Sequence, residues 1–506
     1  MGMAGLLLLL AAGGPDSPYL RRDLDRLEAD WLAVAPPAFA GELDVLCAHR
    51  AKSLRPAVVR TDDVAARHGT GPEGIARLVA AARPRFLLLC GDVGLVPTFV
   101  RRSEYSSPDF ASDPDLATDH LFGAIAGRFP ADTAEELRTM AARTVEFETA
   151  LPPGRWRRKI DLVASEGGFG APLDALLEFE FARVVAREIP PAYDVEIAFA
   201  KPSSRYCVHP PAFRRHVLGM IRQGALLFAY VGHGRRSGFD DLRWNGSAYP
   251  ILESRDADSV EAPGGRPIMA ALACSTGQYD AEAGDALGEE LMKRKRGPVA
   301  FLGGSRITQP YGNALLGRLL LKRFLDPRLR TLGEVLWEAK AGVSEKDASP
   351  FRLRADALAA MIQGPAGLEP MRKDVVLHYN LLGDPALAIP RPSEDLGMET
   401  LGILAPGRRI RVLGRASEGP AEVTLEHPRD RVPGPGEEPE GEGPEARMAR
   451  RYARANDPVV VRTSVPVREG RFEAILDLPE DLRPGPYYLK AQAGTSIGAL
   501  EVEIRD

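Results

Sequence analysis

Apolar residues along this chain gather into short continuous runs, separated by stretches with helical spacing. Continuous runs of this length are expected for strands that helices bury on both faces. The runs predict strands over Leu6–Ala12, Leu43–His49, Arg85–Asp92, Lys159–Glu166, Asp194–Ala200, Ala225–Gly232, Pro267–Cys274 and Pro298–Gly303. The intervening stretches predict helices over Pro18–Leu32, Thr133–Ala150, Asp174–Glu188, Ala212–Arg222 and Asp285–Arg294. This alternation predicts an α/β fold with a mostly parallel sheet, long enough for two side-by-side α/β subdomains.

The pattern changes after Pro390. Short alternating runs such as "RIRVLGR" and "RFEAILDL" lie between Gly/Pro turns and predict a β-sandwich of roughly a hundred residues. Within it, Pro428–Glu445 is rich in Pro, Gly and Glu, which is typical of disorder. We therefore expect an N-terminal α/β subdomain over 1–155, a second α/β subdomain over 156–392, and a β-sandwich over 393–506 with a disordered loop at 428–450.

Composition narrows the class of protein. The 506 residues are 44% hydrophobic and 27% charged, with a net charge of -5, as in ordinary globular proteins. The chain has no excess of basic residues that would predict a nucleic-acid partner. No stretch approaches the ~20 apolar residues of a membrane span. The start, "MGMAGLLLLLAAGG", fits either a first buried strand or a weak signal peptide without Lys or Arg. As the sequence stands we expect a cytoplasmic protein, and an exported one if that segment is a signal peptide or the true start lies upstream.

Three strand ends carry reactive side chains. "VASEGG" ends in Glu166, "FAYVGHG" carries His233, and "MAALACSTG" carries Cys274. Because sites in α/β sheets form at the carboxyl ends of strands, these residues can supply a nucleophile, a base and an orienting acid. Each also has a simpler interpretation: a solvated strand end, a turn, and a buried thiol. Spacing alone does not show whether they meet.

The residue types suit attack on a carbonyl carbon. An imidazole next to a thiol draws off its proton, and can return that proton to a leaving amine near neutral pH. Gly232 and Gly234 let a substrate backbone approach closely. The backbone N–H groups of Gly234 and Cys274 could form an oxyanion hole.

Two other functions fit the fold class. A nucleotide-binding enzyme is disfavoured because "GHGRRSG" spaces its glycines as GxGxxxG and "GDVGLVP" lacks the Lys-Ser/Thr of a P-loop. A catalytically silent scaffold or binding protein is the second alternative, against which the intact Cys, His and Glu argue.

The chain resembles the gingipain family of cysteine peptidases, in the caspase-like clan. "AYVGHG" is similar to the family's histidine motif, "ALACSTGQY" to its nucleophile motif, and "VASEGG" to the segment that supplies the acid. "FLLLCGDVGLVP", the stretch Thr118–Glu148, "ELMKRKRGPVAFLGGSRITQPYGN" and "YNLLGDPAL" extend the similarity in order from Leu6 to Pro390.

The resemblance implies a cysteine endopeptidase that cleaves protein or peptide substrates through a thioester acyl-enzyme and requires no cofactor. It makes Cys274 the nucleophile, His233 the general acid/base and Glu166 the residue that orients His233, with the oxyanion hole on Gly234 and Cys274. The implied fold is a pair of α/β subdomains, the second caspase-like, followed by an immunoglobulin-like domain.

The same resemblance suggests a substrate pocket. In arginine-specific members an acidic residue lines the pocket for the residue before the scissile bond (P1), and Asp174 is the best match. A first-turn acid that stabilises its helix is the simpler interpretation of Asp174. Tyr311 falls where an aromatic residue covers the pocket, and Val231 lies on the pocket side of the histidine motif. A basic P1 side chain is the resulting expectation, which Arg235 and Arg236 would oppose if they pointed inward.

Calcium is the one metal that the resemblance brings in. "SDPDLATD" offers Asp113, Asp115 and Asp119 as hard oxygen donors, although their spacing fits no EF-hand and a polar loop explains them equally well.

Overall fold

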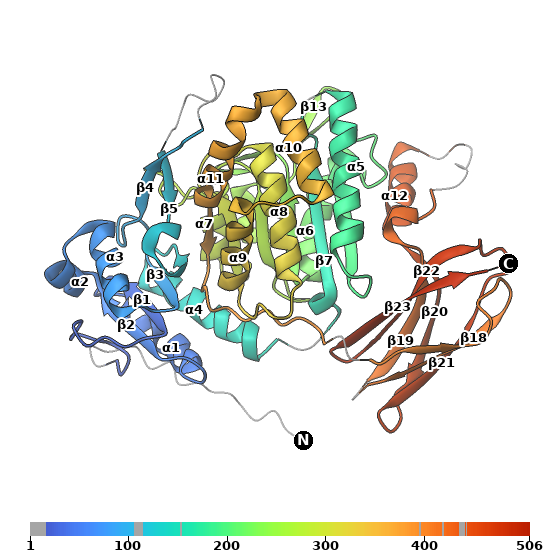
Figure 1. Ribbon diagram of the computed structural model, residues 1–506, viewed down its shortest axis with the longest axis horizontal. Helices are drawn as coiled ribbons and strands as arrows, with labels where there is room; N and C mark the ends of the chain where they lie inside the picture. Colours follow the sequence, from blue (N-terminus) through green and yellow to red (C-terminus); the bar gives the residue numbers. More distant parts are fainter. Residues whose placement is uncertain are drawn as a thin grey trace.

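A computed structural model describes residues 17–105, 115–151, 154–168, 170–393, 396–416, 419–434, 441 and 443–505. Within these residues, one ten-stranded sheet forms the centre of the molecule (Figure 1). In spatial order its strands are β2 (Pro56–Arg60), β1 (Trp31–Ala35), β3 (Phe86–Cys90), β6 (Ile125–Phe129), β16 (Tyr379–Leu382), β15 (Ala300–Gly304), β14 (Ile268–Leu272), β9 (Leu227–Val231), β7 (Lys159–Ser165) and β8 (Asp194–Ala200). Neighbours are parallel except β15 and β16, so the strands on the two sides of that junction point in opposite directions.

Helices cover both faces of this sheet. They are α1 (Asp44–Arg50), α2 (Thr61–His68), α3 (Gly71–Ala82), α4 (Ala134–Thr149), α5 (Ala171–Glu188), α6 (Phe213–Gln223), α7 (Leu287–Lys293), α8 (Pro310–Phe324), α9 (Leu332–Ser344), α10 (Pro350–Gln363) and α11 (Leu368–His378). Short two-stranded pairs join β4 (Phe99–Arg102) to β5 (Asp115–Thr118), β10 (Gly234–Arg235) to β11 (Gly238–Phe239), and β12 (Asp241–Trp244) to β13 (Ser247–Pro250). None of the helices in the described part is long and apolar enough to cross a bilayer.

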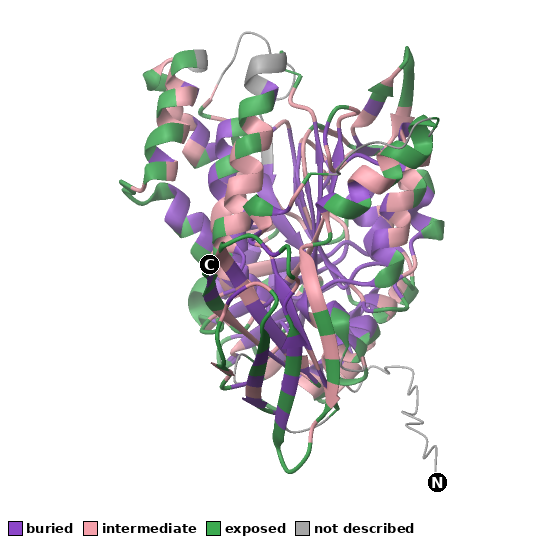
Figure 2. Cartoon of the chain, turned by 90° about the vertical axis from the view of Figure 1, so that its right-hand side faces the viewer, coloured by how far each residue is buried: buried purple, intermediate pink, exposed green. Residues whose placement is uncertain are grey.

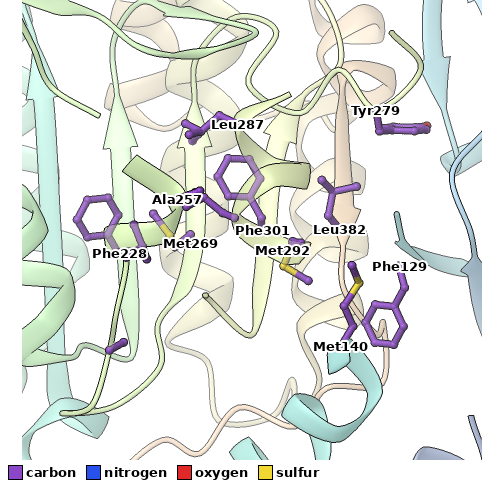
Figure 3. Close-up of a cluster of buried hydrophobic side chains, with 14 of the residues drawn as sticks. Phe129, Met140, Phe228, Ala257, Met269, Tyr279, Leu287, Met292, Phe301 and Leu382 are labelled. Carbon is purple, nitrogen blue, oxygen red and sulfur yellow. The ribbon is translucent and has the colours of Figure 1, made fainter. Parts of the chain in front are cut away.

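The core lies between the sheet and its helices. Figure 2 shows buried residues concentrated in the strands and exposed residues on the outer helix faces. Phe228, Met269 and Phe301 come from neighbouring strands and lie with Leu287 and Met292 of α7 in one buried cluster (Figure 3). This packing explains why the central strands are continuous apolar runs, since both of their faces are covered.

Most predicted elements are confirmed. Six of the strand predictions correspond to β3, β7, β8, β9, β14 and β15, and four helix predictions to α4, α5, α6 and α7. The strand predicted at Leu6–Ala12 lies outside the described residues.

Two predictions near the amino end were wrong. The segment Leu43–His49, predicted as a strand, belongs almost wholly to α1, where Leu46, Cys47 and Arg50 share the buried face at helical spacing. The helix predicted over Pro18–Leu32 is absent from the described residues. Instead β1 begins at Trp31, because "WLAVA" is a fully buried apolar run in the middle of parallel strands.

The region after residue 393 forms two antiparallel sheets. One contains β17 (Glu399–Leu401), β18 (Arg409–Arg415) and β21 (Arg471–Asp477); the other contains β20 (Val459–Pro466), β19 (Pro420–Glu426), β22 (Gly485–Ala493) and β23 (Ser496–Ile504). Alternate residues of both sheets meet in one core that includes Val412, Phe472, Val423 and Leu489. The antiparallel sheets are confirmed, whereas the immunoglobulin-like topology and the boundaries 155 and 392 stay predictions.

The predicted disordered loop at 428–450 was wrong at both ends. At its start, Arg429–Arg431 form a 3-10 helix, and the Arg429 guanidinium donates to the Ile189 carbonyl at 2.6 Å. Helix α12 (Pro444–Ala455) begins inside that range, with a proline in its first turn. Tyr452 of this helix is buried against His216 of α6, with the ring nitrogen Nε2 2.7 Å from the hydroxyl oxygen. Tertiary contact of this kind outweighs the polar composition of the segment.

The residue after α12 also covers the edge of the main sheet. Asn456 Oδ1 accepts from the Ile197 N–H at 2.8 Å, and Asn456 Nδ2 donates to the Ile197 carbonyl at 3.0 Å. Ile197 lies in β8, the outermost strand on that side. A side-chain amide therefore pairs with backbone groups that an edge strand would otherwise leave open.

Candidate functional site

The three predicted reactive residues lie at the carboxyl ends of three neighbouring strands in the sheet. Strands β7, β9 and β14 are parallel neighbours, and their register pairs Val231 with Ala164 on one side and Leu272 on the other. Each reactive residue comes two positions after the residue of its strand in this row. They are Glu166, His233 and Cys274. The sheet thus brings together residues that are far apart in the sequence.

His233 is exposed and its ring is oriented by backbone. Its Nε2 lies 2.8 Å from the carbonyl oxygen of Gly167, the residue after Glu166. The loop that carries His233 is also held, because Tyr230 donates to the His233 carbonyl at 2.7 Å and the His233 N–H donates to Ser165 Oγ at 3.4 Å. The imidazole therefore has a fixed position at the strand end.

The positions on either side of His233 have no room for a side chain, and both are glycine. A Cβ on Gly232 would lie 2.1 Å from Ser165 Oγ and 2.7 Å from the Tyr230 hydroxyl. A Cβ on Gly234 would lie 2.7 Å from the Cys274 carbonyl oxygen. The "GHG" sequence thus lets the histidine loop pack directly on the loop that carries the thiol.

Cys274 is half-buried at the start of a tight turn. Ser275 adopts a φ of 52°, in the left-handed region that non-glycine residues rarely occupy, and its N–H donates to the Arg306 carbonyl at 2.9 Å. The backbone N–H of Thr308 donates to Cys274 Sγ at 3.3 Å. The thiol in turn lies 3.6 Å from the Thr308 carbonyl oxygen, so Thr308 contacts the sulfur through both of its backbone polar groups.

A chain of hydrogen bonds lies behind this contact. Asn313 Nδ2 donates to Thr308 Oγ1 at 2.8 Å, and the Tyr379 hydroxyl donates to Asn313 Oδ1 at 2.8 Å. Tyr379 is fully buried at the start of β16, and burial raises the pKa of its hydroxyl, which keeps it a donor. Sequence reasoning missed Thr308, Asn313 and Tyr379. The strand-end rule could have found Thr308, because it follows β15, the neighbour of β14.

Carboxylates gather beside Glu166. Burial raises the pKa of Glu166, Lys201 opposes that rise, and the charges of Asp174, Glu178 and Asp240 add to it. Asp174 lies in the first turn of α5 and is only 8% exposed. Lys201 forms an ion pair with Glu178 at 3.1 Å. The cluster carries more negative than positive charge and suits a cationic group.

The other predicted pocket residues differ in accessibility. Val231 is half-buried at the end of β9. Tyr311 is 7% exposed in the first turn of α8, and its hydroxyl donates to Asp356 and accepts from Arg372 at 2.8 Å. A role for Tyr311 over the pocket stays a prediction.

One of the three residues suggested for calcium is engaged in an ion pair. Asp113 lies outside the described residues, and Asp119 has both carboxylate oxygens bonded to Arg128 at 2.9 Å. In the part of the chain that the structure describes, no three His, Cys, Asp or Glu side chains are grouped to hold a metal ion. Asp119 is therefore committed to an ion pair, and calcium binding stays a prediction.

Comparison with known proteins agrees with the α/β fold. The model of peptidase family C25 matches residues 25–390, whereas a search of curated proteins gave no match. The crystal structure of the Arg-specific cysteine proteinase gingipain R (RgpB) is 16% identical, covering 94% of this chain and 98% of its own, with a TM-score of 0.51. The complex of Porphyromonas gingivalis RgpB pro- and mature domains gives 16% identity, coverage of 94% and 100%, and a TM-score of 0.50. A further structure, described only as a protease, is 14% identical, covers 94% of this chain and 96% of its own, and has a TM-score of 0.52.

Proposed function

Because this chain belongs to peptidase family C25, a family of cysteine peptidases, we propose that it is an endopeptidase in which Cys274 is the nucleophile and His233 the general acid/base. One observation carries the proposal. The register of β9 and β14 places His233 and Cys274 at corresponding positions past adjacent strands, with the Gly234 backbone packed on the Cys274 carbonyl.

The reaction follows from the contacts of these residues. A proton on Nε2 of His233, donated to the Gly167 carbonyl, leaves the lone pair on Nδ1 to accept the proton of the Cys274 thiol. The thiolate then attacks the peptide carbonyl carbon, and the backbone N–H groups of Gly234 and Cys274 stabilise the oxyanion. His233 returns the proton to the leaving amine, and the thioester is hydrolysed by a water that His233 deprotonates.

Glu166 and Thr308 support this chemistry through charge and hydrogen bonding. Glu166 directly precedes Gly167, whose carbonyl oxygen lies 2.8 Å from His233 Nε2. The Thr308 N–H stabilises the charge that forms on the sulfur. The role that we assign to Glu166 is to orient His233 through this segment, whose carbonyl contacts Nε2.

The substrate preference that the cluster supports is a basic P1 side chain. Asp174, Glu178 and Asp240, whose charges all act on Glu166, supply the negative charge that a guanidinium or ammonium group needs. Arg235 does not oppose this, because Glu253 and Asp241 bind its guanidinium at 2.9 and 3.2 Å.

Thiol labelling tests the nucleophile first. Cys47, Cys90 and Cys207 are buried and Cys274 alone among the four cysteines is half-buried, so iodoacetamide should modify the native protein once. Burial also raises the pKa of Cys207 to about 12. We expect labelling to disappear in Cys274→Ala and to persist in Cys207→Ala.

Hydrolysis of end-blocked, internally quenched peptides tests the activity. We expect cleavage next to Arg or Lys, none by Cys274→Ala, and at least a tenfold lower kcat/KM for those peptides in Asp174→Asn. Asp62→Asn, an exposed change on α2, is the control and should leave kcat/KM unchanged. A labelled Cys274 without any hydrolysis would instead favour a catalytically silent scaffold.

A further inference from the structure

A small cavity lies between α9 and the starts of β6 and β16. Its volume is about 20 Å³, room for one water-sized particle. Asp119, His120, Trp337, Lys340 and Asn380 line it, together with apolar side chains. None of these residues takes part in the chemistry proposed for Cys274 and His233.

Lys340 enters this cavity without a partner of opposite charge. The residue is 4% exposed, and across the described residues its ammonium has no hydrogen bond or ion pair. Asp119 is the one acid that acts on it electrostatically, but both Asp119 oxygens are bonded to Arg128. The buried group therefore contains two cationic side chains and one carboxylate.

The other residues do not restore the balance. Burial lowers the pKa of His120 to about 3, so its ring is neutral. The Asn380 amide is used as well, since its Oδ1 accepts from the Asp119 N–H at 3.0 Å and its Nδ2 donates to the Ala117 carbonyl at 3.1 Å. A buried ammonium without a counter-charge is strongly unfavourable. Burial accordingly lowers the pKa of Lys340 to about 7, against the attraction of Asp119.

We propose that this cavity is a binding site for a monatomic anion, with the Lys340 ammonium as its charged ligand. One such ion balances the Lys340 charge next to the Asp119–Arg128 pair. The small volume favours a halide over phosphate or an organic carboxylate.

Melting temperatures in two salts test the proposal. At equal ionic strength, sodium chloride should raise Tm above its value in sodium gluconate, saturably and by about 1–2 °C, because only chloride fits. Lys340→Met should abolish the difference. Lys322→Met, which removes an exposed lysine from α8, should retain it.

Diffraction from wild-type crystals soaked in sodium bromide gives a second test that needs no variant. An anomalous bromide peak in contact with Lys340 Nζ supports the proposal even if Lys340→Met fails to fold. Equal Tm values in the two salts, or a water beside a neutral Lys340 with no anomalous signal, overturn it.

Discussion

Removing the buried Tyr379 hydroxyl tests whether the hydrogen bonds behind Thr308 position Cys274, the proposed nucleophile. Tyr379→Phe deletes the donor to Asn313 Oδ1, and both residues are buried, so no water replaces it readily. An unsatisfied buried acceptor costs about 1–3 kcal/mol of stability. Asn313 is then free to turn, which releases Thr308 Oγ1 and loosens the backbone N–H that contacts Cys274 Sγ at 3.3 Å.

The catalytic effect depends on how much of that free energy is also lost from the stabilisation of the transition state. If about half of it does, kcat/KM falls roughly three- to tenfold, since 1.4 kcal/mol is a factor of ten. KM should change little, because Tyr379 is buried away from any substrate. The loss should appear in kcat, because the Thr308 N–H contacts the sulfur that attacks the substrate in the proposed reaction.

The assay measures two quantities for each variant: kcat/KM for peptide hydrolysis, and the free energy of unfolding in urea. Tyr487→Phe is the matched control: its hydroxyl donates to the Arg483 carbonyl at 2.9 Å in the C-terminal sheets, so it can lose stability without touching the site. If Tyr379→Phe loses stability yet keeps the wild-type kcat/KM, these hydrogen bonds do not position Cys274.

Three other substitutions probe the site and its frame. Gly232→Ala should lower kcat/KM at least tenfold while circular dichroism stays native, because its Cβ would displace Ser165 and Tyr230; Gly94→Ala, with nothing within 4 Å, should not. Burial raises the pKa of Glu289 to about 8 from 4.5, so folding retains a proton that the unfolded chain releases, and stability falls as pH rises between those values. Glu289→Gln should abolish that fall and raise the urea-derived stability at pH 8 by ~1 kcal/mol or more, whereas exposed Glu338→Gln should not. Asn456→Leu should cost about 1–3 kcal/mol and speed hydrogen exchange of the Ile197 amide; unchanged exchange would contradict its role at the edge of β8.

The strands around the site were predictable because burial on both faces leaves a plain apolar signal. That signal located Glu166, His233 and Cys274 at strand ends, and the shared row of β7, β9 and β14 then brings them together. Two short strands gave no such signal. β6, "IAGRF", contains Arg128, a fully buried guanidinium, and β16 has only four residues.

The parts of the site that stayed hidden depend on backbone atoms and distant pairs. The acceptor for His233 is a carbonyl of Gly167, which any residue could provide, so no side chain marks it. Tyr379 and Asn313 are separated by 66 positions, and only the insertion of β16 beside β15 makes them neighbours. Pairings of this kind depend on topology, which local patterning does not encode.

The place of β16 in the sheet also determines when the molecule can be assembled during synthesis. β6 and β15 are joined only through this strand, and Asp384, just after it, binds Trp31 Nε1 at 2.9 Å and Arg50 Nε at 2.8 Å. The residues that carry the chemistry therefore leave the ribosome well before the strand that unites the two halves. A chain that stops short of Tyr379 keeps β6 and β15 as open edges, prone to pairing with other chains. Such a fragment also lacks the hydroxyl behind Cys274, so incomplete chains are aggregation-prone and have an unsupported nucleophile.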